Sequence, residues 1–210
     1  MARIVSTSLV SLKIFTAIIA VFLLSISIAS AQNYTDDDEN TLLLTTKDGT
    51  LTIRMYPEIA PGHVRRIKQL VRSGYYKGIK FHRVIPGSIV QTGDPSGRNK
   101  GSGKKIRAEF STHKHERGTV SMARYKGKNS ADDQFFFSLK EMPHLDGKYT
   151  IWGMVIAGVD FLDDVKEGDK KTGAVEDPDK VVGIWVASDA ARVNKKMERR
   201  RKSEESKKKK

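Results

Sequence analysis

Two short runs near residue 50 are rich in apolar residues, residues 42–46 and residues 51–56, and apolar and polar residues alternate along the second. A period of two residues is typical of a β-strand with one buried face. The runs flank Lys47-Asp48-Gly49, and an Asp-Gly step favours the tight turn that joins two antiparallel strands. The pattern therefore predicts a β-hairpin near the start of a folded domain.

Two other segments show the longer period of a helix. Residues 60–74 carry apolar side chains at helical spacing, with Pro61 in the first turn and Gly74 where the helix would end. Residues 159–167 show a shorter pattern of the same kind before Gly168, with an apolar face made of Phe161, Leu162 and Val165. The spacing predicts one helix in each segment.

Short apolar runs recur through the rest of the chain, at residues 119–123, 134–139, 149–156 and 181–187. Their lengths suit strands, whereas the glycine-rich residues 93–105 are expected to form a long loop. A chain of 210 residues with this pattern indicates one main domain of mainly β structure. The strands are expected to form a closed barrel, because closure removes exposed sheet edges.

Residues 81–94, FHRVIPGSIVQTGD, place one arginine and one glutamine in a largely apolar run. Arg83 and Gln91 are eight residues apart, and alternate residues of a strand share a face. Both side chains can therefore face one cavity if the Pro86-Gly87 turn preserves the register. A cavity with apolar walls, one fixed cation and one amide suits the binding of an uncharged peptide group better than its hydrolysis.

Three blocks of sequence resemble the cyclophilins, which are peptidyl-prolyl cis-trans isomerases, and they occur in the family's order. They are residues 81–94, residues 118–123 (GTVSMA) followed by the QFF of residues 134–136, and residues 144–153 (HLDGKYTIWG). The similarity spans residues 41–188, and the short loops and the DPDKVV ending resemble bacterial members. The resemblance implies a closed eight-stranded antiparallel β-barrel with an α-helix capping each end, a monomeric state, and an activity that needs no cofactor and no metal.

The resemblance also implies roles for single residues. Arg83 matches the family's catalytic arginine, a donor for the prolyl nitrogen, and Gln91 matches the glutamine that orients the substrate carbonyl. The backbone of residues 123–125 matches the segment that pairs with bound peptide. The alternatives are a surface ion pair for Arg83 and a structural hydrogen bond to the backbone for Gln91. The resemblance further implies that a larger set of residues binds the substrate: Phe81, Ser88, Ile89, Gly101, Ala123, Arg124, Tyr125, Gln134, Phe136, His144, Leu145 and Tyr149. For the apolar members of this set, plain core packing is the alternative.

Four positions depart from the family pattern. Ser88 replaces an aromatic pocket residue, Ile89 replaces a methionine, and Tyr149 replaces a histidine at the rim. His144 stands where many eukaryotic members carry a tryptophan, which argues against tight cyclosporin binding. Ser88 removes apolar contact with the proline, so weaker binding or a shallower cavity is expected. The alternative function is a catalytically weak proline-peptide binding module or folding chaperone.

Several other classes of protein are excluded by composition and context. The chain contains no cysteine, which rules out disulfides, thiolate nucleophiles and cysteine-zinc sites. His113 and His115 can share a strand face, but no carboxylate set accompanies them at ligand spacing, so no metal site is predicted. Ser121 lacks the G-x-S-x-G context of a serine hydrolase, and residues 97–103 match no phosphate-binding motif.

The first 31 residues have the pattern of a signal peptide. A basic start precedes a fifteen-residue apolar stretch, residues 14–28, and Ala29-Ser30-Ala31 matches the A-x-A cleavage pattern. The stretch is shorter than the ~20 residues that span a bilayer. An uncleaved anchor is the alternative, and it would leave the domain on the same side. We therefore expect export, which in a bacterium means the periplasm.

The rest of the chain divides into an acidic linker (residues 32–41), the isomerase-like domain (residues 42–189) and a basic tail (residues 190–210). The formal net charge is +13, and residues 192–210 contain eleven Lys or Arg against three Asp or Glu. The tail is expected to be disordered, and contact with an anionic membrane surface is its functional alternative. No specific nucleic-acid binding is predicted, because no aromatic residues interleave the tail. The expected partners are proline-containing unfolded or flexible polypeptides.

Overall fold

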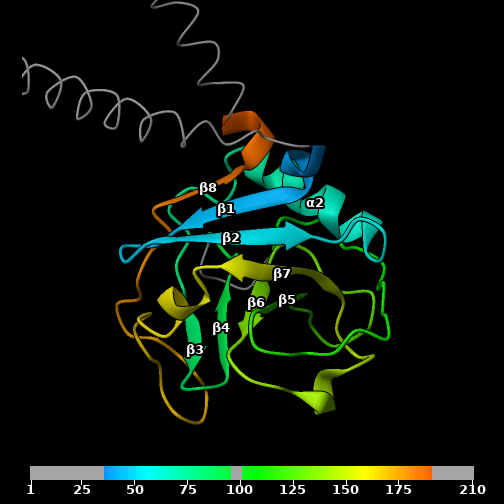
Figure 1. The fold of residues 1–210 in the computed structure, drawn as a ribbon. Helices are drawn as coiled ribbons and strands as arrows, with labels where there is room; N and C mark the ends of the chain where they lie inside the picture. The colour runs from blue at the N-terminus through cyan, green and yellow to red at the C-terminus, as the bar shows by residue number, and fades with distance from the viewer. Residues whose placement is uncertain (1–35, 96–100, 191–210) are drawn as a thin grey trace, which may run out of the picture. The chain divides into compact units, whose positions relative to one another are not determined.

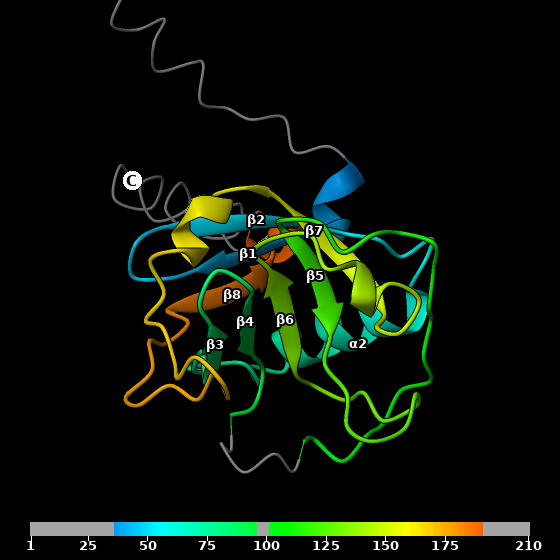
Figure 2. The ribbon, with the colours of Figure 1, turned by 90° about the horizontal axis from the view of Figure 1, so that it is seen from below.

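The computed structural model describes residues 36–95 and 101–190. The predicted signal peptide and nearly all of the predicted basic tail lie outside these residues. The strands are short and belong to one antiparallel sheet in the order β3-β4-β6-β5-β7-β2-β1-β8, and Figure 2 shows β3, β4, β6 and β5 side by side in that order. Their bounds are β1 Thr41–Thr45, β2 Thr50–Met55, β3 Arg83–Ile85, β4 Ile89–Thr92, β5 Thr119–Met122, β6 Phe135–Ser138, β7 Ile151–Ala157 and β8 Gly183–Val186.

The mainly β architecture and its eight antiparallel strands confirm the predicted fold class (Figure 1). The predicted hairpin is β1–β2, in which Leu42 pairs with Ile53 and Leu44 pairs with Leu51. These four side chains are fully buried, as a two-residue period with one buried face requires.

The sheet curls into a barrel whose two edge strands, β3 and β8, do not form a continuous ladder. Closure comes from the segments before them, where Phe81 N donates to Asp179 O (2.9 Å) and Val181 N donates to Ile79 O (2.8 Å). The outer edge of β3 is occupied by a loop instead of β8, because Val84 N donates to Gly173 O and Val84 O accepts from Gly168 N. The barrel is therefore less completely closed than the sequence predicted.

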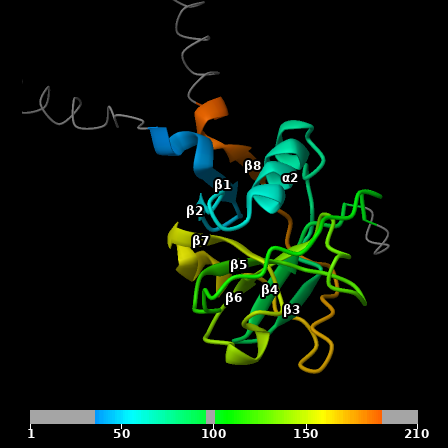
Figure 3. The ribbon, with the colours of Figure 1, turned by 90° about the vertical axis from the view of Figure 1, so that its right-hand side faces the viewer.

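The first predicted helix is α2, Pro61–Arg72, which lies across one end of the curled sheet (Figure 3). Gly74 follows it with a φ of +73°, a left-handed conformation that glycine adopts without the strain of a side chain. The carboxylate of Glu109 accepts hydrogen bonds from the backbone N–H groups of Gly62 (2.9 Å) and His63 (3.0 Å). A negative charge at this end of a helix is also attracted by the positive end of the helix dipole, which stabilises the helix.

The second predicted helix, residues 159–167, is wrong, because the segment forms only one 3-10 turn, η3 Val159–Leu162. Long-range bonds take the backbone groups that an α-helix would need. Lys166 N donates to the Asp179 carboxylate (2.9 Å) and Gly168 N donates to Val84 O (3.0 Å). Besides α2, α-helical structure in the described residues is found at residues 187–190.

The acidic segment before β1 is packed against the domain where the structure describes it, contrary to the predicted linker. Residues Asp36–Asn40 form a 3-10 turn, η1. Glu39 accepts hydrogen bonds from Arg72 Nη2 (2.9 Å), Ser188 Oγ (2.8 Å) and Lys68 Nζ (3.3 Å). The Arg72 bond, with help from Ser188 and Lys68, lowers the pKa of Glu39 to about 2. An acidic run looks like solvated linker because its basic partners are distant in sequence.

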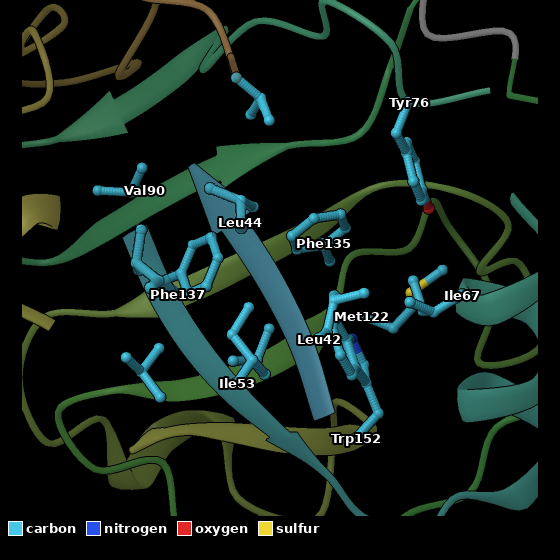
Figure 4. Packing of buried hydrophobic residues seen from close by; sticks show 14 of the residues in the cluster. Leu42, Leu44, Ile53, Ile67, Tyr76, Val90, Met122, Phe135, Phe137 and Trp152 are labelled. Carbon is cyan, nitrogen blue, oxygen red and sulfur yellow. The ribbon is translucent and has the colours of Figure 1, made fainter. Parts of the chain in front are cut away.

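The hydrophobic core fills the inside of the barrel, and β6 separates it from the outer face of the sheet. Phe135 packs edge-on against Trp152 (ring centroids 5.5 Å apart) and Tyr76 (5.7 Å), as Figure 4 shows. Phe137 is also fully buried in this core. Phe136, between them, belongs to a separate small cluster. Alternation along one strand thus directs two phenylalanines to the core and the third to the opposite face.

Candidate functional site

The outer face of the sheet carries a row of three side chains on neighbouring strands. Arg83 on β3 pairs with Gln91 on β4, and Gln91 pairs with Phe136 on β6. The turn at Pro86-Gly87 preserves the register, with a φ of +59° at Gly87 and a hydrogen bond from Ser88 N to Ile85 O (3.0 Å). The predicted common face of Arg83 and Gln91 is confirmed.

A chain of hydrogen bonds fixes the polar members of this row. Arg83 Nη1 donates to Gln91 Oε1 (3.1 Å), and Gln91 Nε2 donates to Gln134 Oε1 (2.8 Å). Arg83 Nε donates to the carbonyl oxygen of Thr172 (3.0 Å). The guanidinium is therefore held at two points, and the orientation of the Gln91 amide is set by its neighbours on both sides.

A cavity of about 290 Å³, called the apolar cavity after its floor, opens beside this row. Its floor is the small cluster of Ile89, Phe136 and Met142, all buried. A hollow that combines an apolar floor with a few fixed polar groups is typical of a small-ligand site. The residues that line it are Arg83, Ile85, Ser88, Ile89, Gln91, Ala123, Arg124, Phe136, Met142, His144, Leu145 and Tyr149.

The rim of the apolar cavity is held by aromatic and cationic contacts. The Tyr149 ring meets Phe136 edge-on, with centroids 5.6 Å apart. The guanidinium carbon of Arg124 lies 4.8 Å from the centre of the Tyr149 ring, and its Nε donates to Lys148 O (3.1 Å). A cation over a ring face is attracted by the ring's electron density, so Arg124 and Tyr149 restrain each other.

A second cavity of about 470 Å³ adjoins the first. The two share Arg83, Gln91, Ala123 and Arg124, so the arginine–glutamine pair lies between them. The second cavity is completed by Tyr125, Asp132, Asp133 and Gln134. A ligand seated in the first cavity would therefore present its neighbouring groups to the second, across the same pair.

Comparison with known proteins assigns this arrangement to a family. The family model described as cyclophilin type peptidyl-prolyl cis-trans isomerase/CLD matches residues 41–186. The chain belongs to this family. A probable peptidyl-prolyl cis-trans isomerase of Brucella suis is 40% identical over 189 residues, which cover 83% of this chain and 96% of the relative. Peptidyl-prolyl cis-trans isomerase B of Bacillus subtilis is 39% identical over 127 residues, covering 59% of this chain and 88% of the relative.

Solved cyclophilins share the fold. The crystal structure of cyclophilin AquaCyp293 from Hirschia baltica has a TM-score of 0.65 and 29% identity, and the match covers 73% of this chain and 76% of that one. A cyclophilin type isomerase of Cryptosporidium parvum, crystallised in the presence of the dipeptide ala-pro, has a TM-score of 0.63 and 31% identity. That match covers 70% of this chain and 98% of the other.

Most of the residues that the cyclophilin resemblance pointed to line one of the two cavities, but Phe81 and Gly101 do not. Phe81 is fully buried in the core. It precedes β3, and its backbone N–H donates to Asp179 O, one of the hydrogen bonds that close the barrel. Gly101 lies beside Asp132, whose Oδ2 would be 2.6 Å from an added Cβ. The glycine therefore allows its loop to approach Asp132, which lines the second cavity, and does not line the cavity itself.

Sequence reasoning missed four lining residues: Ile85, Met142, Asp132 and Asp133. Ile85 could have been found, because it lies two residues after Arg83 and so shares its strand face. Met142 follows β6 in a loop, where no period indicates direction. The two aspartates precede Gln134, and their burial depends on contacts with α2 and the tyrosines after it.

The environment of the two aspartates differs. Asp132 Oδ1 accepts from Arg66 Nη2 (3.1 Å), and its Oδ2 accepts from two backbone N–H groups, at residues 103 and 104. Asp133 accepts from the Tyr75 hydroxyl (2.6 Å), and its Oδ1 has no hydrogen-bond partner within the described residues. Burial, together with the neighbouring carboxylates, raises the pKa of Asp133 to about 6. Among the residues described, no group of three or more His, Asp or Glu side chains is arranged to hold a metal ion.

Proposed function

We propose that this member of the family isomerises X-Pro bonds non-covalently, with Arg83 as the donor to the prolyl nitrogen and Gln91 as the group that holds the substrate carbonyl. The observation that carries the proposal is the position of the hydrogen-bonded Arg83–Gln91 pair at the junction of the two cavities. The proline ring would occupy the apolar cavity, over Phe136.

The chemistry requires stabilisation of a twisted amide. The peptide bond has partial double-bond character and a rotation barrier of about 18–20 kcal/mol. Rotation ends the resonance and localises a lone pair on the prolyl nitrogen. A fixed N–H donor aimed at that nitrogen stabilises the twisted state more than the planar one, and such differential binding accelerates the rotation. Arginine suits this role because it stays charged and its planar head is already held in place.

The cavity supports this assignment by shape and polarity. Its buried floor, Ile89, Phe136 and Met142, offers apolar contact to a five-membered ring. The related Cryptosporidium parvum structure was obtained in the presence of the dipeptide ala-pro, which supports proline-containing peptides as ligands here. On the polar side, Gln91 is oriented by Arg83 and Gln134 before any ligand arrives, so little ordering would be needed on binding.

The test compares catalysed cis-trans exchange of a short X-Pro peptide by the chain and by its Arg83→Ala variant. Loss of the donor is expected to lower kcat/KM by about 100-fold or more. Arg117→Ala is the matched control, because Arg117 pairs with Asp160 and Asp163 away from both cavities. Exchange that survives in Arg83→Ala would refute the mechanism. Peptide binding without exchange in the native chain would instead support the proline-peptide binding module.

The compartment is the second part of the proposal. We infer that the chain is exported and acts on proline-containing segments of exported polypeptides, in the periplasm of a bacterium. The support is the basic start, the apolar residues 14–28 and the Ala29-Ser30-Ala31 pattern. The basic residues 192–210 would favour an anionic membrane surface. Cell fractionation of the full chain, with sequencing of the mature N-terminus, tests the export. Uncut protein in the cytoplasm would contradict it.

A further inference from the structure

His115 neighbours Phe136 of the apolar cavity and itself lines neither cavity. Its side chain is fully buried. The imidazole is nearly parallel to the ring of Phe136, with an interplanar angle of 8° and centroids 6.2 Å apart. Phe136 forms the cavity floor, so the imidazole neighbours the floor ring from outside the space that the cavity leaves open.

The same residue also ties down one wall of the cavity. The backbone N–H of His115 donates to Asp146 Oδ1 (2.9 Å), and Nδ1 lies 2.9 Å from the same oxygen. The carbonyl oxygen of His115 accepts from Met142 N (2.8 Å). Met142 and Asp146 flank the 3-10 turn η2, Pro143–Leu145. The wall segment is therefore held at both of its ends by one residue.

The hydrogen bonds fix the position of the proton on the imidazole. A carboxylate only accepts, so Nδ1 must carry the hydrogen that faces Asp146. Nε2 is then the unprotonated nitrogen, and it is buried with no hydrogen-bond partner in the described part of the chain. A second proton on the ring would place an N–H group and a positive charge where no acceptor meets them.

The surroundings of the pair favour a neutral ring beside an ionised carboxylate. Burial lowers the pKa of His115 although Asp146 opposes this, and the hydrogen bond from His115 lowers the pKa of Asp146 to about 2. Lys114 Nζ lies 3.3 Å from Asp146 Oδ2, and His144 disfavours a further positive charge nearby. From β6, the group that faces the imidazole is the Phe136 ring.

We propose that His115 is a positioning residue for the proline cavity, and that a second proton on its ring releases the floor and wall and so weakens substrate binding in acid. The inference rests on the proposed function, since it assumes that the apolar cavity holds the proline. Protonated imidazole would move towards solvent to hydrate Nε2. The stack on Phe136 and the restraint on residues 142–146 would then be lost, while Arg83 and Gln91 would stay paired.

The test measures KM and kcat for a short Ala-Pro peptide from about pH 8 to about pH 5 in the full chain. We expect KM to rise by about tenfold as the pH falls below the ordinary histidine value, with kcat changing much less. In His115→Asn, the amide can still donate to Asp146 but does not titrate. At high pH, the KM of this variant is expected to stay within about threefold of the native value. On acidification, its KM should no longer rise.

The matched control is His63→Asn. His63 is also fully buried, faces a carboxylate (Nδ1 2.6 Å from Glu109 Oε2) and has a buried Nε2 without a partner in the described residues. It lies on α2 and lines neither cavity. This variant should retain the acid rise in KM. A rise that persists in His115→Asn, or disappears in His63→Asn, would overturn the proposal.

A second measurement uses the native chain alone and does not depend on how the variants fold. The Phe136 ring resonances should shift on acidification with the same midpoint as KM. Phe136 signals that stay constant while KM rises would overturn the inference. Failure of the proposed function is distinguishable, because it would leave no exchange activity at any pH, whereas failure of this inference leaves an active enzyme with a flat KM profile.

Discussion

Asp132 and Asp133 are adjacent and almost fully buried, and the same substitution is expected to change stability in opposite directions at the two positions. The Asp132 carboxylate meets the Arg66 guanidinium and two backbone N–H groups. Asp133 meets one neutral hydroxyl, that of Tyr75, and leaves Oδ1 without a partner in the described residues. The negative charge of the ionised carboxylate is thus compensated by its partners at Asp132 and poorly compensated at Asp133.

The magnitude follows from the pKa of Asp133, which burial and the charges of Asp132 and Asp94 raise from 3.8 to about 6. A carboxyl group with a raised folded-state pKa contributes stability that is complete below 3.8 and is lost as the pH rises through about 6. Two pKa units correspond to roughly 3 kcal/mol, an upper value because the site can relax. Asp133→Asn should therefore raise the free energy of unfolding by about 1–3 kcal/mol near pH 7.5 and by almost nothing near pH 4.

Asp132→Asn should lower the free energy of unfolding by about 3 kcal/mol, because it leaves the largely buried Arg66 without its charged partner. Urea unfolding followed by tryptophan fluorescence, with Trp152 in the core, measures both variants at the two pH values. The reasoning is refuted if Asp133→Asn destabilises near pH 7.5, or if its gain is the same near pH 4. Either result would mean that the Asp133 carboxylate is compensated after all.

Two further predictions concern the cavity and the acid limb of stability. Ser88→Phe adds apolar surface beside Met142 and Ile89, and we expect it to lower KM for an X-Pro peptide by about tenfold, measured by exchange kinetics, whereas an unchanged KM would mean that Ser88 does not face the proline. Burial lowers the pKa of three histidines, so their stability contribution is complete above 6.5 and is lost as the pH falls below it. The three histidines are His63, His82 and His115. In the Asp133→Asn chain, the opposite pH dependence of Asp133 is removed. Urea unfolding of this variant should therefore show a free energy of unfolding that falls as the pH drops below 6.5.

The local period of the sequence predicted those parts of the fold whose direction depends on neighbours in the chain. The hairpin β1–β2, the helix α2 and the common face of Arg83 and Gln91 all follow from spacing and turn residues. The segment at residues 159–167 has the same kind of apolar spacing. It does not form a helix, because the Asp179 carboxylate accepts the N–H of Lys166. The spacing of apolar residues within a segment carries no information about a hydrogen-bond partner outside that segment.

The candidate site divides in the same way. Residues on β3, β4 and β6 were placed correctly, since pairing puts Arg83, Gln91 and Phe136 in one row. The loop residue Met142 was missed, because no period indicates its direction, which depends on tertiary bonds such as that from Met142 N to His115 O. Other loop residues of the cavity, such as His144 and Tyr149, were predicted only through the resemblance to the family. The resemblance to the family could assign positions to the cavity, but Phe81 shows its limit: the position matches and the side chain lies in the core.

The alternation of β6 couples stability and function at neighbouring residues. Phe135 and Phe137 pack in the core of the barrel, and Phe136 between them forms the cavity floor. A register slip of one residue would reverse all three, emptying the core and filling the cavity. The packing of Phe135 and Phe137 in the core therefore fixes the position of Phe136 in the cavity floor, while the neighbouring His115 fixes the orientation of the Phe136 ring. On this argument, substitutions at Phe135 or Phe137 should reduce stability and peptide affinity together, whereas His115→Asn should change the pH dependence of affinity with a much smaller loss of stability.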